Sequence, residues 1–276
     1  MTAGRVHTQP QSWWGWHGWY NRPDSMSVTR LIRAGNFSAR VAGLFWLGLE
    51  RGASIIVAAD PPRAGKTTTL TALLAFAPQD AQAHYTCGWG ETFDVPPLEP
   101  GQPTYLLINE ISDHLPIYTW GPYVVRAFEL LQQGYSLAST MHASSTAGVV
   151  RQLTVENGVP LHHLARLTFI VPMGVWVREG GVLRRVLEVT FLQPSSSGSP
   201  EPQMDRVVRW EPETDRFHVL ESPGHRQDVA AWMGMTPEAL AEELDRREAY
   251  LTGLVAAGVE AAPDVLAAIH AYRTPD

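Results

Sequence analysis

The stretch from Ser54 to Leu70 constrains the fold of this chain more than any other, and it reads SIIVAADPPRAGKTTTL. Its apolar, β-branched beginning, Ile55 to Ala59, is typical of a parallel strand that is buried on both faces. The prolines after Asp60 end that strand, and Gly65-Lys66-Thr67-Thr68 begins a helix with leucines on one face. A strand, a tight loop and a helix that begins with Gly-Lys-Thr predict a phosphate-binding loop in an α/β fold.

The chemistry of such a loop assigns roles to its residues. Amide groups at a helix N-terminus attract anionic oxygens, and the helix dipole adds to that attraction. Lys66 would reach the β- and γ-phosphates of a nucleotide, and the Thr67 hydroxyl would bind Mg²⁺. The residues that we predict to bind the nucleotide are Arg63, Ala64, Gly65, Lys66, Thr67 and Thr68.

The loop departs from the pattern G-x-x-x-x-G-K-[ST] at its first position, where this chain has Asp60. The Asp60 carboxylate would lie near the phosphates and repel them. Arg63 is the nearest cation in the loop, so we hypothesise that Asp60 and Arg63 form a compensating pair.

Two further strands end in side chains that suit chemistry beside this loop. Thr104 to Asn109 is apolar and ends in Glu110, which would polarise an attacking water or hold Mg²⁺ through a water. Ser136 to Met141 ends at His142, which either senses the γ-phosphate through a hydrogen bond or caps local backbone. The carboxyl ends of parallel strands face the ligand crevice. We therefore predict that Glu110 and His142 are catalytic.

Composition limits the class of function. The 276 residues suffice for one large domain, or one domain with a small appendage. The formal net charge of −7 argues against a nucleic-acid partner, because non-specific binding to nucleic acid needs a basic surface. Cys87 is the only cysteine, which fits a reducing compartment. No signal peptide or spanning segment is recognised, so we expect a cytoplasmic protein.

The chain divides into four predicted parts. They are a Trp-rich N-terminal arm (1–26), a P-loop core (27–192), a linker or loop (193–202), and a β-hairpin with a C-terminal helical region (203–276). The arm contains Trp13, Trp14, Trp16, Trp19 and Tyr20. These aromatic residues either pack on their own domain or form a docking patch or bilayer anchor.

Helix and hairpin signals are clear in several places. Serines cap predicted helices at 28–34 and 39–51, and further helices are predicted at 120–133, 147–155, from Thr236 onward, and at 265–272. Hairpins are predicted at 167–192 and 203–220. The loop 87–101 contains Glu91, Asp94 and Glu99, which are either solvated or include a second acid near the nucleotide.

Together these motifs resemble the secretion-superfamily ATPases, the hexameric motors of type II and type IV secretion and of type IV and tight-adherence pili. Their loop resembles GPTGSGKTT, and Asp60 to Thr68 reads DPPRAGKTT. Their Walker B region resembles GEIRD, and Asn109 to Asp113 reads NEISD. Their histidine box resembles GHLVLSTLH, and Gly134 to His142 reads GYSLASTMH. The resemblance covers roughly residues 27–192, and Arg151 falls where the family has an arginine after that box.

The resemblance implies a RecA-like P-loop sheet with flanking helices, ATP and Mg²⁺ as cofactors, and a homo-oligomer that is hexameric in the family. It also implies a membrane-protein partner in a secretion or pilus machine, which would hold this cytoplasmic chain at the inner membrane. The family's separate N-terminal domain is not recognised before the P-loop, so we expect slow hydrolysis by the chain alone. The alternative is a nucleotide-binding regulatory or scaffold subunit with little or no turnover. A P-loop kinase would need an acceptor site, and none is recognised.

Overall fold

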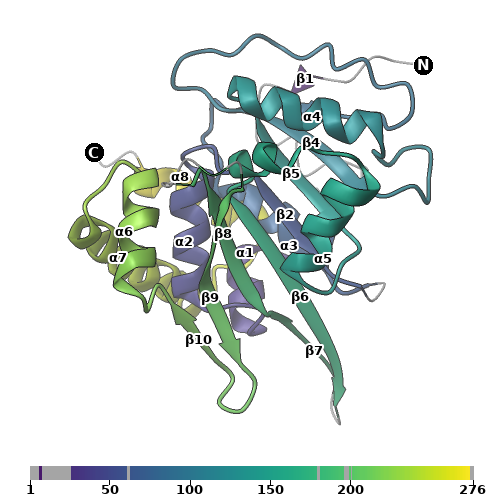
Figure 1. The fold of residues 1–276 in the computed structure, drawn as a ribbon. Coiled ribbons are helices and arrows are strands. Elements are labelled where there is room, and N and C mark those ends of the chain that lie inside the picture. Colours follow the sequence, from purple (N-terminus) through teal and green to yellow (C-terminus); the bar gives the residue numbers. More distant parts are fainter. Residues whose placement is uncertain are drawn as a thin grey trace.

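A computed structural model describes residues 6–7, 26–60, 63–178, 181–195, 199 and 201–273. This part of the chain forms an α/β fold around one sheet of ten strands, with helices on both faces (Figure 1). The strands are β1 (Val6–His7), β2 (Ile55–Ala58), β3 (Gln82–Tyr85), β4 (Thr104–Ile111), β5 (Ser136–Met141), β6 (Phe169–Arg178), β7 (Gly181–Val186), β8 (Glu188–Gln193), β9 (Gln203–Glu211) and β10 (Arg216–Val219).

The α-helices of the described residues are α1 (Val28–Arg33), α2 (Ala39–Leu49), α3 (Lys66–Leu73), α4 (Pro122–Gln133), α5 (Thr146–Arg151), α6 (Pro223–Trp232), α7 (Pro237–Ala256) and α8 (Ala262–Arg273). Short 3₁₀ turns follow α3 at Leu74–Phe76 and precede β6 at Leu161–Arg166, and a π-helical turn continues α5 over Gln152–Glu156. The predicted fold class, an α/β P-loop sheet with flanking helices, β-hairpins and a C-terminal helical segment, is confirmed.

The centre of the sheet is parallel. Its strands lie in the order β3-β4-β5-β2-β6, and each neighbouring pair in this run is parallel. The antiparallel strands β8, β9 and β10 extend the sheet beyond β6. Because β5 lies between β4 and β2, a residue at the carboxyl end of β5 lies between the residues at the carboxyl ends of β4 and β2. This order determines the site described below.

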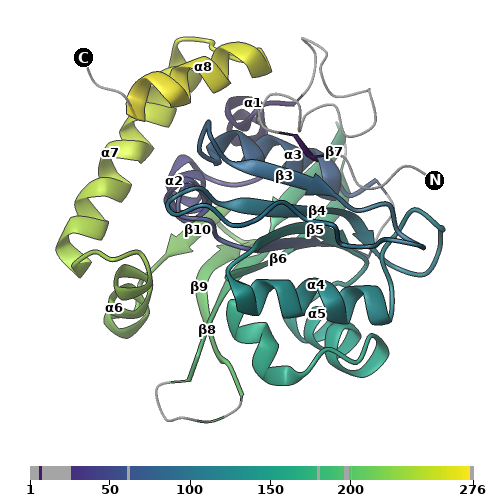
Figure 2. The same ribbon diagram turned by 90° about the horizontal axis from the view of Figure 1, so that it is seen from above.

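Alternate residues of β2 enter two different hydrophobic cores. Ile55 and Val57 belong to the core that includes α1, α2 and α3, whereas Ile56 and Ala58 belong to the core that includes α4 and α5. Figure 2 shows these helix groups on opposite faces of the sheet. A strand that is covered on both faces needs apolar side chains at every position. That requirement accounts for the continuous apolar run before Asp60.

The predicted helix caps are present. The side chains of Ser27, Ser38 and Thr236 accept hydrogen bonds from backbone N–H groups three residues further on, at the starts of α1, α2 and α7. Gly134 ends α4 in the left-handed conformation, with φ of 110°. Such caps satisfy backbone groups that a helix end leaves without partners.

The C-terminal helices support α2, which in turn lies next to the P-loop region. Arg247 of α7 has a side chain that is only 5% exposed, and it forms ion pairs with Glu50 and Glu243 at 2.9 and 2.8 Å. Its guanidinium also stacks over the Trp46 ring, at 4.6 Å from the centroid. Both charge and stacking therefore fasten the C-terminal segment to α2.

Some predicted elements differ from the structure. The second strand of the first hairpin, predicted at 182–192, is divided at Leu187. β7 pairs with the outer half of β6, whereas β8 pairs with the start of β6 on one side and with β9 on the other. The strand before Glu110 continues through Glu110 to Ile111. β1 and α6 were not predicted as separate elements. The aromatic cluster of the N-terminal arm lies outside the described residues.

Among the described residues, no helix combines the length and apolar character that crossing a bilayer requires.

Candidate functional site

The loop between β2 and α3 takes two left-handed turns before the helix begins. Arg63 has φ of 62° and Gly65 has φ of 92°, and Gly65 is the N-cap of α3. The position of Arg63 is one where the resembled loop has glycine, so the backbone keeps a glycine-like conformation with an arginine in it. A Cβ at Gly65 would also lie 3.3 Å from Cδ of Arg184. No side chain of the described residues caps α3, so its first N–H groups, which lack intrahelical partners, suit an anion.

Lys66, the first residue of α3, is nearly buried and surrounded by polar groups. Its ammonium donates a hydrogen bond to the carbonyl of Ala59 at 3.2 Å and lies 3.2 Å from both ring nitrogens of His142. It is 3.9 Å from the carboxylate of Glu110, and the Lys66 side chain is 8% exposed. Burial lowers the pKa of Lys66, and the charges of Glu110 and Asp60 offset part of that effect.

The strand order explains why His142 contacts both Lys66 and Glu110. His142 follows β5, which lies between β2, the strand before the loop, and β4, the strand that contains Glu110. His142 Nε2 is 3.4 Å from Oε1 of Glu110, and its Nδ1 is 3.3 Å from the carbonyl of Asp60. The predicted loop, acid and histidine are therefore brought together at the carboxyl edge of the sheet.

The pairing of β4 with β5 is irregular around Glu110. Ile108 pairs with Ser139 and Ile111 pairs with Met141, so β4 contains one more residue than β5 between these pairs. Such a bulge bends the strand and redirects a side chain, and bulges are common next to active sites. Thr140 fixes the bulged segment by donating a hydrogen bond to the carbonyl of Asn109 at 2.9 Å.

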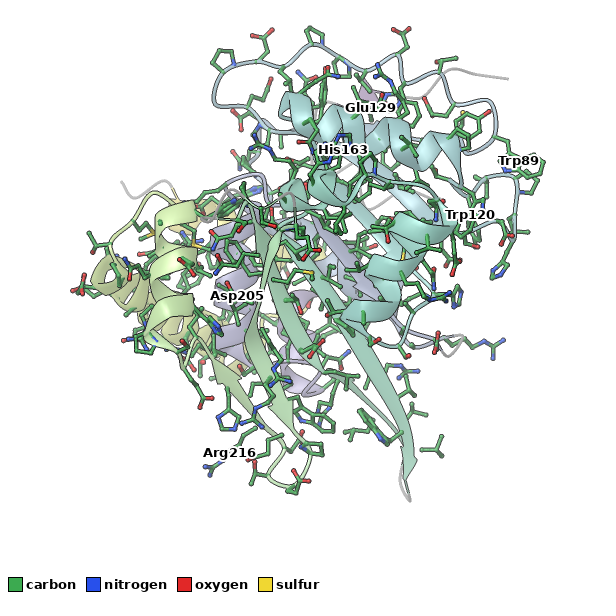
Figure 3. All side chains as sticks on the ribbon, in the orientation of Figure 1. Trp89, Trp120, Glu129, His163, Asp205 and Arg216 are labelled. Atoms are coloured by element: carbon green, nitrogen blue, oxygen red, sulfur yellow. The ribbon has the colours of Figure 1, made fainter. Side chains whose placement is uncertain are left out.

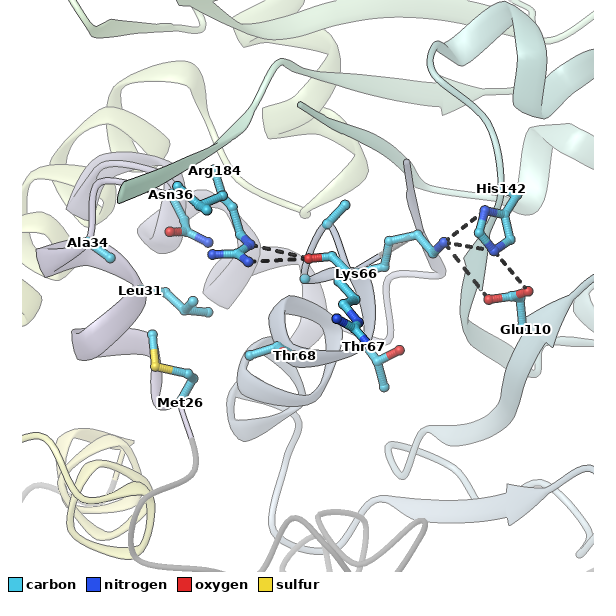
Figure 4. Close-up of a pocket in the computed structure, with 14 residues that line it drawn as sticks. Met26, Leu31, Ala34, Asn36, Lys66, Thr67, Thr68, Glu110, His142 and Arg184 are labelled. Carbon is cyan, nitrogen blue, oxygen red and sulfur yellow. Dashed lines mark hydrogen bonds and ion pairs between the residues drawn. The ribbon is translucent and has the colours of Figure 1, made fainter. Parts of the chain in front are cut away.

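A cavity of about 700 Å³ connects the loop with the strand ends, and Figure 4 shows its lining. Every residue predicted to bind nucleotide, together with Glu110 and His142, lines this cavity. The sequence did not indicate the remaining lining residues, which are Met26, Leu31, Ala34, Asn36, Val182 and Arg184. They come from α1, its flanking segments and β7, and no local pattern marks them as parts of a site.

The donor set at the loop fits Mg²⁺. The Thr67 hydroxyl and the Glu110 carboxylate both line the cavity, and oxygen ligands are those that Mg²⁺ prefers. A second set of ligand atoms, from Glu110, His114 and His142, lies within 4.8 Å. Two imidazoles suit transition metals better than Mg²⁺. His114 was not identified from the sequence.

Other acidic residues of the sequence have different surroundings. Glu91 and His84 are fully buried as a pair at 3.2 Å, and Glu91 also accepts hydrogen bonds from the backbone N–H groups of Cys87 and Phe93. Burial raises the pKa of Glu91, but these hydrogen bonds outweigh it and bring the pKa to about 2. Glu91 is thus neither solvated nor beside the nucleotide loop; it holds together a loop from which Trp89, 59% exposed, projects outward (Figure 3). Asp94 and Glu99 are exposed.

The proposed compensating pair is not formed. Among the described residues, no ion pair joins Asp60 to Arg63; both are exposed, and the Arg63 carbonyl instead accepts hydrogen bonds from Arg184 at 3.4 Å. Arg151 does not line the cavity; it forms an ion pair with Glu156 at 2.8 Å.

Comparisons with known proteins give distant relatives. No protein-family model matches the chain. Among curated sequences, it is 27% identical over 265 residues to uncharacterized protein MJ0900 of Methanocaldococcus jannaschii, covering 84% of this chain and 46% of that protein. It is 25% identical over 253 residues to uncharacterized protein MJ1287 of the same organism, covering 82% and 90%. The chain thus spans about half the length of MJ0900.

Two solved ATPases resemble the structure over part of its length. The VirB11 ATPase of the Brucella suis type IV secretion system, solved with sulphate, matches with a TM-score of 0.40 and 18% identity, covering 58% of this chain and 53% of that chain. The Legionella pneumophila ATPase DotB matches with a TM-score of 0.35 and 11% identity, covering 79% and 57%.

Proposed function

We propose that this chain is an ATP-binding and ATP-hydrolysing motor-type ATPase of a secretion or pilus-like machine. The observation that carries the proposal is the grouping of Lys66, Glu110 and His142 around one cavity that begins at the N-terminus of α3. A cation, an acid and a hydrogen-bond donor beside such a terminus form a set suited to phosphoryl chemistry.

Each side chain has a role that follows from its contacts. Lys66 lines the cavity, where its ammonium donates a hydrogen bond to the carbonyl of Ala59, and it would bind the β- and γ-phosphate oxygens. Glu110 would accept a hydrogen bond from the attacking water and orient it towards the γ-phosphate. His142, which contacts both residues, would donate a hydrogen bond to that phosphate and couple its presence to β5.

Thr67 and Glu110 are the residues that would hold Mg²⁺, Thr67 through its hydroxyl and Glu110 through a water. When bound, Mg²⁺ supplies positive charge that neutralises the phosphate oxygens. The amides of Arg63, Ala64, Gly65 and Thr68 complete the predicted phosphate contacts.

The assembly and location of the chain are part of the same proposal. Motors of this kind work as homo-oligomers, hexameric in the resembled superfamily, and act on a membrane-protein partner. A chain with this function would lie in the cytoplasm, at the inner membrane through that partner. A net charge of −7 supports a partner other than nucleic acid.

One observation favours the alternative, a nucleotide-binding regulatory or scaffold subunit with little turnover. Asp60 stands where the loop pattern has glycine, and no cation pairs with its carboxylate among the described residues. A carboxylate near the phosphates opposes binding of the triphosphate.

Steady-state ATP hydrolysis and solution mass, measured in one buffer, test the proposal. We expect saturating ATP-Mg²⁺ to raise the melting temperature, since ligand at 100 times Kd stabilises a protein by about 2.7 kcal/mol. Lys66→Ala should remove that shift, and Glu110→Gln should keep it while removing turnover. Binding without measurable turnover, alone or with a partner, would support the scaffold instead. The absence of any shift with ATP-Mg²⁺ would refute nucleotide binding.

A further inference from the structure

We propose that the end of the cavity formed by α1 and β7 binds the base of an adenine nucleotide, with Asn36 as the residue that recognises the base. This inference rests on the proposed nucleotide site and adds to it the place where the base binds and the residue that recognises the base. Figure 4 shows Met26, Leu31, Ala34, Asn36 and Arg184 at the end of the cavity opposite Glu110 and His142.

Asn36 has the properties of a preorganised recognition residue. It is only 5% exposed, yet among the described residues no hydrogen bond is formed by its side-chain amide. Its backbone is held on both sides, because its N–H donates to the carbonyl of Leu31 at 3.0 Å and its carbonyl accepts from the N–H of Val186 at 2.8 Å. The amide itself lines the cavity, so its donors and its acceptor are available to a ligand there.

The walls around Asn36 suit a flat, largely apolar ring. Leu31 is 2% exposed, and Met26, Ala34 and Val182 line the same end of the cavity. Pockets of roughly 300–1,000 Å³, mostly apolar with a few placed polar groups, are typical for small ligands. At about 700 Å³ the cavity has room for a nucleotide that reaches from this end to Thr67.

Arg184 connects this end with the phosphate loop. Its guanidinium donates to the Arg63 carbonyl at 3.4 Å, and its Cδ is the atom that a Cβ at Gly65 would meet. Its neighbour Arg185 forms an ion pair with Asp215 at 2.7 Å. Among the described residues Arg184 has no carboxylate partner, so its donors are available to the ribose or the α-phosphate.

The amide of Asn36 indicates which base is bound. An amide offers one acceptor and one donor, which match the exocyclic N6–H and a ring nitrogen of adenine. A carboxylate at this position would instead accept from the N1–H and N2–H groups of guanine. Asn36→Asp should therefore change base preference without touching the phosphate loop.

The experiment compares three probes, each with Mg²⁺, by calorimetric titration of the full chain: ATP, GTP and inorganic tripolyphosphate. Tripolyphosphate has the three phosphates of ATP but neither base nor ribose. We expect Asn36→Ala to weaken ATP about tenfold, the effect of about 1.4 kcal/mol, and to change tripolyphosphate less than twofold. Asn36→Asp should shift the ratio of ATP to GTP affinity towards GTP by at least about tenfold. An unchanged ratio, or equal losses for ATP and tripolyphosphate, would overturn the inference.

A second variant keeps the test decisive if the Asn36 variants do not fold. Ala34 is exposed at the end of α1, so Ala34→Trp fills the base end with little cost to folding. It should weaken ATP at least about tenfold and leave tripolyphosphate unchanged; unchanged ATP affinity would refute the base site. Lys66→Ala is the control for the proposed function. Wild-type protein that binds neither ATP nor tripolyphosphate would remove the proposed function and this inference together, whereas wild-type binding with unaffected Asn36 and Ala34 variants removes the inference alone.

Discussion

The ion pair between Lys66 and Glu110 predicts an unusual result for Glu110→Gln: weaker folding without nucleotide and stronger nucleotide binding. The two side chains are 8% and 11% exposed and 3.9 Å apart. At an effective dielectric constant of 20 their gross attraction is about 4 kcal/mol, and the desolvation of both charges offsets part of it. We therefore expect Glu110→Gln to destabilise the protein by about 2 kcal/mol, roughly 5 °C in Tm for a chain of this length.

Phosphate oxygens can replace the charge that the substitution removes. The free energy that the variant loses without nucleotide is then regained on binding, so ATP should bind at least about tenfold more tightly to Glu110→Gln than to wild type. Titration in EDTA isolates this effect, because Glu110 is also a candidate contact for Mg²⁺. The assay is a pair of thermal scans, with and without ATP, followed by calorimetric titration.

Asp113→Asn is the matched control. Asp113 follows β4 three residues after Glu110, but its side chain is 65% exposed. The same loss of one negative charge should change stability and ATP affinity by less than about 0.5 kcal/mol. If Glu110→Gln melts at the wild-type temperature and binds ATP as wild type does, the ion pair contributes no stability and the reasoning is wrong.

Two further predictions concern residues whose backbone or charge is unusual. Arg63→Gly should change the free energy of unfolding by less than about 0.5 kcal/mol, whereas Arg63→Val should lower it by more than about 1 kcal/mol, because φ of 62° strains a β-branched residue. Equal effects of the two substitutions in urea titrations would contradict this prediction. Glu91→Gln should lower stability by about 3 kcal/mol at pH 7, the linkage value of its shift from 4.5 to a pKa of about 2. Because the folded-state pKa of Glu91 is depressed, its contribution to stability is present above pH 4.5 and lost as pH falls towards 2. The difference in unfolding free energy between wild type and Glu91→Gln should therefore be smaller by about 1 kcal/mol at pH 3.5 than at pH 7. A difference that does not change with pH would refute this prediction.

Local patterns were sufficient to predict that Lys66, Glu110 and His142 meet at the cavity. Glu110 and His142 lie at the ends of apolar strands, and Lys66 begins the helix that follows another such strand. A strand's apolar run and its boundary depend on short stretches of sequence. The caps at Ser27 and Ser38 were predictable for the same reason. Each of these features is set by neighbours within a few residues.

The features that the sequence did not reveal depend on pairing between distant segments. The order β4-β5-β2 puts His142 between Lys66 and Glu110, and nothing in the three separate strands states that order. The wall formed by Asn36 and Arg184 joins residues that are far apart in the chain. The division of the hairpin at Leu187 likewise follows from the pairing of β8 with β9.

Asp60 departs most clearly from the loop pattern, and its surroundings in the structure differ from those that the sequence suggested. The sequence suggested that Arg63 would neutralise it, but these side chains form no ion pair among the described residues, and the charge of Asp60 acts on Lys66. Asp60 is exposed, so its interaction should be worth about 0.2–1 kcal/mol, and it should be screened by salt. Its carboxylate therefore competes with phosphate for the same ammonium. We expect Asp60→Gly to strengthen ATP binding about two- to fivefold at low salt, with a smaller gain at 0.5 M salt, where the Debye length is below roughly 8 Å. Asp60→Asn, which removes the charge but not the side chain, should give a similar gain if charge is the cause. A gain with glycine alone would show that backbone freedom, rather than repulsion, limits the loop.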